Sequence, residues 1–253
     1  MLSITFALLV ALLTFAGGYA GLRLQTLLPE EHSVDKSREM IGSVMGLVTL
    51  LLALVLGTIV GSAYFFSATQ VAELQTLSAR ALQLDRALAE YGPETKGARE
   101  AMKGGMEKAY QLFWGGGEVD RAELSPTAAI ANLQGMHDYL AKLEPKTPEQ
   151  TRAAGAANAN FGQLESTRIL MSLQLANAFS KPLLICVIFW SVFLFCGFGL
   201  LSRSNATTLA ALLFGAFAVA SAVFLILELS QPYTGLFRIS PAALQQTIEA
   251  MGK

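Results

Sequence analysis

The apolar residues of this chain gather in four long stretches that contain no charged residue. These stretches cover residues 1–22, 40–72, 182–202 and 204–227. Each reaches the length of about 20 apolar residues that a helix needs to cross a bilayer. No Lys or Arg precedes Arg23, which favours a membrane helix over a cleaved signal peptide for the first stretch. The pattern therefore predicts four membrane helices, arranged as one hairpin at each end of the sequence.

The region between the hairpins is rich in alanine and polar residues and has helical spacing. Neither Gly nor Pro occurs over residues 62–91, so we expect the second membrane helix to continue beyond the bilayer. Its apolar residues recur at spacings of three and four, the pattern of a helix that packs against partners. They are Leu74, Leu77, Ala81, Leu84, Leu88 and Tyr91. Ser125-Pro126 and Thr147-Pro148 are typical helix starts, so the region is predicted to be an antiparallel helical bundle.

These elements predict an all-α membrane protein with four transmembrane helices in two hairpins and an inserted extramembrane helical bundle. The first hairpin is expected over residues 1–66, the bundle over 67–180 and the second hairpin over 181–229. Residues 230–253 are expected to form an interfacial segment with a short helix, because Ser240-Pro241 is a further helix start.

The composition agrees with a membrane protein. Hydrophobic residues make up 53% of the chain and charged residues 15%, against about 25% charged in soluble domains. The lipid bilayer is therefore the expected partner. The net charge of −1 and the absence of a basic patch exclude a nucleic-acid-binding function.

No common catalytic or phosphate-binding motif occurs in the sequence, so we expect neither enzyme activity nor a cofactor. One pair in the first loop, His32 and Asp35, is of a type that can contribute to a cation site. The alternative is a solvated turn in which Asp35 helps to start the next helix.

The second membrane helix carries a row of small residues on one face. This row consists of Gly42, Gly46, Ala53, Gly57 and Gly61. Small residues allow a second backbone to approach closely, so the row either packs within the four-helix unit or faces a pore or a subunit interface. In the pore interpretation, leucines of this helix form a hydrophobic constriction, and a carboxylate at the end of the fourth helix attracts cations. The pore or gate candidates are Gly46, Leu50, Leu54, Gly57, Gly61 and Glu228.

Charged residues near the roots of the bundle are candidates for a latch. Arg168 interrupts an apolar helix face, where it could meet Glu73 or Asp85 of the long helix. Lys181 and Arg238 are the candidate partners of Glu228. The surrounding stretch, ILELSQPYTGLFRIS, is also typical of a simple interfacial anchor, with Glu228 in water and Tyr233 at headgroup depth. The sequence leaves the anchor and the gating contact equally open.

Three blocks together make the chain resemble the bestrophin-like domain-of-unknown-function family of bacterial and plant integral membrane proteins. The blocks are His32-x-x-Asp35 leading into Ile41-Gly42-x-x-Met45-Gly46-Leu47, Leu84-Asp85-Arg86-x-Leu88-x-x-Tyr91-Gly92-Pro93-Glu94 followed by Arg99, and Leu227-Glu228-Leu229-x-x-Pro232-Tyr233-x-Gly235 leading to Ile239-Ser240. The resemblance implies a four-helix membrane unit with a helical insertion and, by analogy with bestrophins, an oligomeric ion channel.

The functional hypothesis is a homo-oligomeric channel for inorganic ions in the bacterial inner membrane, with the second helix lining the pore. The alternative is a membrane-anchored sensory or scaffold protein whose bundle binds a ligand or partner. The short turns at Arg23–Glu39 and Arg203 carry cations, so the positive-inside rule places them in the cytoplasm and the bundle outside it.

Overall fold

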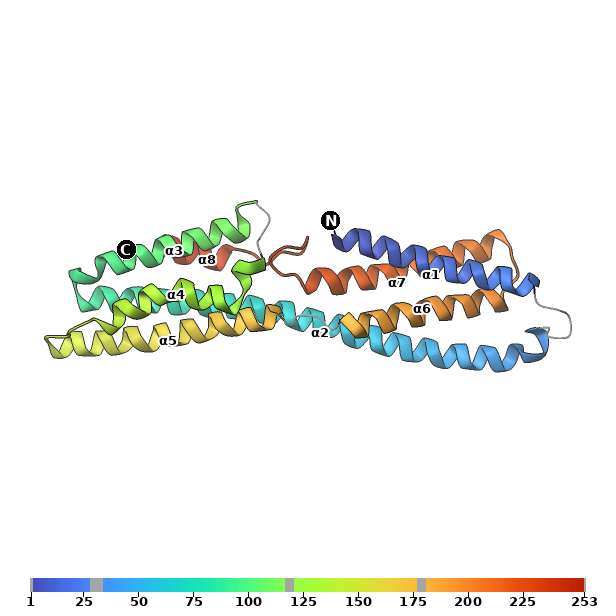
Figure 1. Cartoon of the computed structure of the whole chain (residues 1–253), viewed down its shortest axis with the longest axis horizontal. Coiled ribbons are helices and arrows are strands. Elements are labelled where there is room, and N and C mark those ends of the chain that lie inside the picture. The colour runs from blue at the N-terminus through green and yellow to red at the C-terminus, as the bar shows by residue number, and fades with distance from the viewer. Residues whose placement is uncertain (1, 28–33, 117–120, 177–180, 253) are drawn as a thin grey trace. The chain divides into compact units, whose positions relative to one another are not determined.

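The structure is a computed structural model that describes residues 2–27, 34–116, 121–176 and 181–252 (Figure 1). Within these residues the protein is all-α, as predicted, and no strand occurs. The chain divides into two compact units. The first, here called the membrane unit, contains residues 1–65 and 179–230. The second, the bundle unit, contains residues 66–178 and 231–253.

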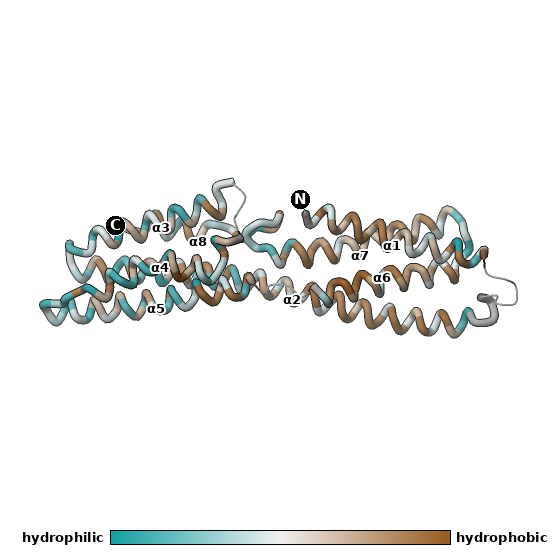
Figure 2. The backbone as a smooth tube through the Cα atoms, viewed as in Figure 1, coloured by the Kyte–Doolittle hydropathy of each residue, from teal (hydrophilic) through white to brown (hydrophobic). Residues whose placement is uncertain are grey.

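Among the described residues, four helices are long and apolar enough to cross a membrane, which confirms the prediction from the apolar stretches. They are α1 (Leu2–Leu27), α2 (Val34–Tyr91), α6 (Lys181–Leu201) and α7 (Ala206–Leu229). Figure 2 shows hydrophobic residues along α1, α6 and α7 and along the first part of α2. As predicted from the run without Gly or Pro, α2 continues as one helix of 58 residues and contributes to both units.

Glycines bring α1 and α6 into backbone contact within the membrane unit. A Cβ atom added to Gly21 would meet the backbone of Cys196 and lie 2.9 Å from the nitrogen of Leu200. One added to Gly199 would meet the backbone of Gly18. These positions accept only glycine, because neighbouring backbone atoms cannot rotate away as a side chain would.

The membrane part of α2 is held to its unit by a narrow stripe of side chains. Met45, Leu52 and Ile59 recur every seven residues and pack against Val187 and Leu194 of α6. Only 17% of the most apolar part of α2 is buried, against 28–39% in the other three membrane helices. Most of the surface of α2 in the membrane unit is therefore uncovered by its own chain.

The bundle unit is built from the second part of α2 and from α3 (Lys96–Trp114), α4 (Pro126–Ala141), α5 (Pro148–Ala176) and α8 (Ala242–Ala250). Short 3₁₀ turns lie at η2 (Pro93–Thr95) and η3 (Arg121–Leu124). The predicted apolar stripe of α2 is buried at Leu74, Ala81, Leu84, Leu88 and Tyr91. Bundle helices interleave polar and apolar residues, as Figure 2 shows, because only one face of each is covered.

Both predicted helix starts in the bundle have the expected capping bonds. The Ser125 hydroxyl accepts a hydrogen bond from the Ala128 nitrogen at 3.2 Å. The Thr147 hydroxyl accepts one from the Gln150 nitrogen at 3.2 Å, and the Gln150 side chain accepts one from the Lys146 nitrogen at 2.8 Å. These bonds satisfy backbone donors that the first turn of a helix leaves without partners.

Residues 231–252 pack as part of the bundle unit. The short helix expected there is present as α8, and its Leu244, together with Met251, joins a core that includes Ala81 and Leu164. Tyr233 is 5% exposed and packs with Leu74. This burial contradicts the anchor interpretation, in which Tyr233 lies among lipid headgroups, because the chain returns to the bundle after α7 and covers the tyrosine with apolar side chains.

Candidate functional site

The five pore candidates of α2 lie on one face of the helix, and all five are exposed. At about 100° per residue, Gly46, Leu50, Leu54, Gly57 and Gly61 fall within an arc of about 80°, roughly opposite the stripe that holds α2 to its unit. Leu50 is 71% and Leu54 65% exposed. A Cβ atom added to any of the three glycines would have no atom within 4 Å. We call these five residues the open face of α2.

The open face distinguishes the two interpretations of the small-residue row. Packing within the four-helix unit requires neighbouring atoms, and such neighbours exist for Gly17 and Gly21 of α1 but not for Gly46, Gly57 or Gly61 of α2. The α2 glycines are therefore available to a molecule outside the protomer, which the α1 glycines are not.

Glu228 does not have the exposure that the sequence interpretation requires. It lies at the end of α7 and is 3% exposed. The expectation that it reaches water at a pore mouth is therefore wrong within this protomer. Ile226, two residues earlier, is also buried and packs with Val187 and Leu194. Glu228 is thus a buried residue of α7 and does not belong to the open face.

The proposed latch and metal residues are only partly described. Arg238 is exposed and donates a hydrogen bond to the backbone oxygen of Gly235 at 3.3 Å. Lys181 begins α6, but its side chain lies outside the described residues, as do His32 and the side chain of Asp35. The metal site at His32 and Asp35 therefore stays a prediction. Among the residues that the structure describes, no group of three or more His, Cys, Asp or Glu side chains could hold a metal ion.

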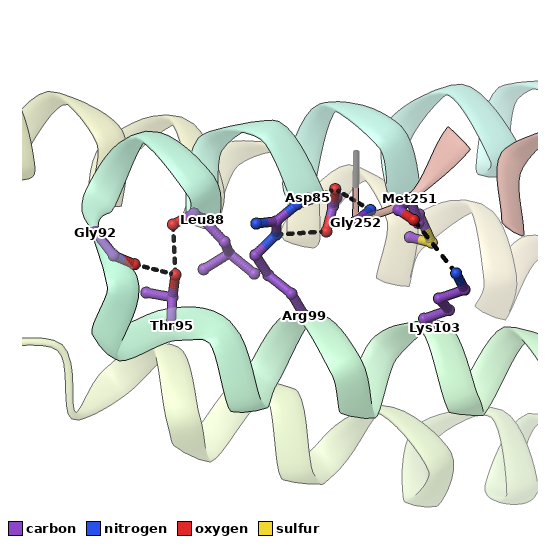
Figure 3. Close-up of polar contacts among 8 residues, drawn as sticks. All are labelled: Asp85, Leu88, Gly92, Thr95, Arg99, Lys103, Met251 and Gly252. Atoms are coloured by element: carbon purple, nitrogen blue, oxygen red, sulfur yellow. Dashed lines mark hydrogen bonds and ion pairs between the residues drawn. The ribbon is translucent and has the colours of Figure 1, made fainter. Parts of the chain in front are cut away.

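Asp85 has a partner that the sequence analysis did not assign to it (Figure 3). Arg99 donates from Nε to Oδ1 of Asp85 at 2.8 Å and from Nη2 to Oδ2 at 2.9 Å. The Asp85 and Arg99 side chains are 9% and 22% exposed. Hydrogen bonding to Asp85 raises the pKa of the Arg99 guanidinium. The candidate pairing of Asp85 with Arg168 is therefore wrong, because Asp85 forms a bidentate ion pair with Arg99 instead.

The corner between α2 and α3 explains why Asp85 and Arg99 meet. Both residues lie seven positions, about two helical turns, from Gly92. Gly92 has a φ of 142°, which favours glycine and permits the reversal. Thr95 secures the corner by donating from its hydroxyl to the backbone oxygens of Leu88 and Gly92 (Figure 3). The block that carried part of the family resemblance is thus a structural corner with a buried ion pair at its base.

The C-terminal segment also contacts this ion pair. The Gly252 nitrogen lies 3.4 Å from Oδ2 of Asp85, and Lys103 donates to the backbone oxygen of Met251 at 3.4 Å (Figure 3). Arg99 and Lys103 are four residues apart on α3 and so point to the same side. These contacts connect α2, α3 and the C-terminal segment, so the role that they indicate is structural.

A second polar cluster connects α2, α5 and the C-terminal segment. Gln70 is fully buried and donates to Gln174 at 2.6 Å, and Gln174 donates to Glu73 at 2.8 Å. The Tyr233 hydroxyl donates to Gln70 at 3.4 Å, and burial raises the pKa of Tyr233 well above its usual range. The predicted contact of Glu73 with Arg168 is therefore replaced by a contact with Gln174.

Sequence reasoning missed the glutamines of this cluster, although one signal was present. Gln70 lies within the uncharged stretch over residues 40–72, where a polar amide is costly unless it has hydrogen-bond partners. Trp114 is a second example of a polar group with a distant partner, because its Nε1 donates to the backbone oxygen of Ile239 at 2.8 Å. An isolated polar group in an apolar pattern predicts that a hydrogen-bond partner exists, but it does not identify the residue that provides it.

Comparison with known proteins agrees with this architecture. A family model described as the bestrophin-like domain matches residues 12–244, which include most of both hairpins and the whole helical insertion. No curated protein and no solved structure matches the chain. The four apolar helices and the extent of this match show a membrane protein, and the chain belongs to the bestrophin-like family.

Proposed function

We propose that the protein is a homo-oligomeric ion channel in which the open face of α2 lines the pore or joins neighbouring protomers around it. The observation that carries the proposal is the exposure of Gly46, Leu50, Leu54, Gly57 and Gly61 on one side of a helix whose other side is packed. The family is of channel type, which favours the same function. Inorganic ions are the expected cargo.

The two residue types of the open face suit different parts of such an assembly. Glycines let helices of neighbouring protomers approach closely. Leu50 and Leu54 lie one turn apart, so in a ring of subunits each would contribute one apolar layer. A narrow apolar layer blocks ions when it loses its water and conducts when it widens and is wetted. The gate we propose is therefore a leucine constriction.

Accessibility of a single cysteine tests whether the open face lines the pore. In protein lacking Cys186 and Cys196, we expect Leu54→Cys channels in planar bilayers to lose most of their current when a charged, water-soluble thiol reagent is added. Phe214→Cys is the matched control, because Phe214 is 79% exposed on α7 in the membrane unit. Its current should persist if that surface faces lipid. We also expect Leu54→Ser to raise the current several-fold, because a hydroxyl favours wetting.

Two outcomes would contradict the proposal. Purified protein that carries no current over a wide range of voltages and ions would exclude a channel. Channels that conduct but respond equally to the reagent at Leu54→Cys and Phe214→Cys would exclude α2 as the specific pore-lining helix.

We also propose that the protein lies in the bacterial inner membrane with its bundle outside the cytoplasm, on the basis of the cations in the short turns. Glu144 lies in an exposed loop of the bundle, and Ser204 lies in the exposed turn between α6 and α7. We expect a membrane-impermeant maleimide to label Glu144→Cys in spheroplasts, and Ser204→Cys only after permeabilisation. Labelling in the reverse order would place the bundle in the cytoplasm.

A further inference from the structure

A cavity of about 640 Å³ lies inside the bundle unit. This volume falls within the range of about 300–1,000 Å³ that small-molecule sites occupy. Small residues on the surrounding helices leave the space open where larger side chains would fill it. They are Ala81, Ala101, Gly105, Ala109, Ala129 and Gly135. The remaining wall is mostly leucine, methionine and phenylalanine, so the cavity favours an apolar occupant.

The cavity is long rather than round. Its wall includes both Leu74 and Leu84 of α2, which are ten residues, or about 15 Å, apart along the helix. Leu74 packs with Phe113 and Tyr233, whereas Leu84 belongs to a separate cluster with Phe161. A chain-like molecule fits this shape better than a compact one.

Arg168 places a positive charge near the end of the cavity that contains Phe113. Its guanidinium carbon lies 5.9 Å from the centre of the Phe113 ring, and Nη2 donates to the backbone oxygen of Glu123 at 3.5 Å. Among the described residues, no carboxylate forms an ion pair with Arg168 within 4.0 Å. Burial lowers the pKa of this guanidinium, yet an arginine stays charged at neutral pH.

Arg168 is half-buried, and within the part of the chain that the structure describes its guanidinium forms one hydrogen bond. A guanidinium has five N–H donors, and a single bond of 3.5 Å is weak. Removing such a charge from water is costly unless an acceptor compensates for it. The other charged or amide residues of the wall are Lys108, Glu123 and Asn132. An anionic group beside Arg168 would supply the missing acceptors.

We propose that this cavity binds a long-chain amphiphile with an anionic head, with the head at Arg168 and the alkyl chain along the apolar wall toward Leu84 and Phe161. The proposal rests on the shape of the cavity and on the charge at one end. It is independent of the proposed channel, since every residue named lies in the bundle unit.

Trp114 offers a direct measurement because it lines the cavity. The chain contains two tryptophans, and Trp190→Phe leaves Trp114 as the single fluorophore. Bromine on an alkyl chain quenches tryptophan by contact. We expect full-length Trp190→Phe protein in a non-ionic detergent to show saturable quenching by dibromostearate and binding at least about tenfold weaker for the matching dibromo-alcohol, which lacks the charge.

Variants of α5 test the role of Arg168. We expect Arg168→Gln to weaken dibromostearate binding about 10- to 100-fold, the range that a charge-assisted hydrogen bond contributes. Binding of the alcohol should not change, which shows that the variant is still folded. Arg168→Lys should retain most of the binding. Arg152→Gln is the matched control, because Arg152 lies on the same helix with a side chain that is 77% exposed.

Brominated phosphatidylglycerol distinguishes the two sources of such a ligand. Saturable, Arg168-dependent quenching by free dibromostearate alone would identify a free fatty acid, and quenching by the phospholipid as well would identify a bilayer lipid. The proposal is overturned if neither probe quenches Trp114 saturably. It is also overturned if the carboxylate and the alcohol bind equally, or if Arg168→Gln binds dibromostearate like the unmodified protein.

Discussion

Gly21→Val is expected to destabilise the membrane unit, whereas the same substitution at Gly57 leaves that unit folded. The first Cβ atom of valine at position 21 would collide with the backbone of Cys196 and lie 2.9 Å from the Leu200 nitrogen. The helices α1 and α6 must then separate along their closest contact. We expect a loss of about 3 kcal/mol, the upper end of the range for overpacked interiors, because a backbone atom cannot move aside.

The reactivity of two native cysteines measures this loss of stability in the membrane unit. Cys186 and Cys196 are both free and both lie on α6. Heating the full-length protein in detergent with a thiol-reactive dye should therefore report separation of α6 from its neighbours. A loss of this size should lower the transition by about 10 °C for Gly21→Val. Equal transitions for Gly21→Val and the unmodified protein would contradict the observed backbone contact.

Gly57→Val is the matched control within the same unit. No atom lies within 4 Å of a Cβ atom at Gly57, so the substitution should leave the dye transition in place. It should instead reduce the mass of the detergent-solubilised particle if neighbouring protomers pack against the open face. The two variants thus separate folding of the protomer, measured by the dye, from assembly, measured by mass.

The architecture could be predicted from the sequence because each pattern that indicates a helix is local. A run of 20 apolar residues, a Ser-Pro or Thr-Pro helix start and an absence of glycine each act over one or a few turns. The membrane helices, the capping bonds of Ser125 and Thr147 and the continuous α2 follow from such signals. The open face could be predicted only in part. Periodicity places its residues on one side of α2, but only the tertiary packing shows that this side is uncovered.

The partners of the polar residues could not be obtained in the same way. Tyr233 after a membrane helix is typical of an interfacial anchor, and the same ring with a hydroxyl also suits a buried site with one hydrogen bond. The partner that decides between these interpretations, Gln70, is 163 residues away in the sequence. Helix periodicity likewise offered only Arg168 as a partner for Asp85. The conformation of the Gly92 corner brings Arg99 to Asp85 instead.

Asp85→Ala is expected to destabilise the bundle unit by about 3 kcal/mol, the lower end of the cost of breaking a buried ion pair. The lower end applies because Arg99 is 22% exposed and water can partly solvate it once the carboxylate is gone. The substitution removes both bonds from Arg99 and the contact with the Gly252 nitrogen. Thermal unfolding of the full-length Trp190→Phe protein, followed by Trp114 fluorescence, measures the effect within the bundle.

Two further variants show whether the loss of stability arises from the charge of Arg99, which Asp85→Ala leaves without a partner. Glu90→Ala removes an exposed pair with Arg86 at 3.2 Å and should cost about 1 kcal/mol or less. Asp85→Leu combined with Arg99→Met replaces the buried pair by apolar side chains and should recover much of the stability lost in Asp85→Ala, because no charge is left without a partner. If the double variant is as unstable as Asp85→Ala, the corner depends on the specific geometry of the two hydrogen bonds. If Asp85→Ala and Glu90→Ala cost the same, the Asp85–Arg99 pair contributes no more than a surface contact.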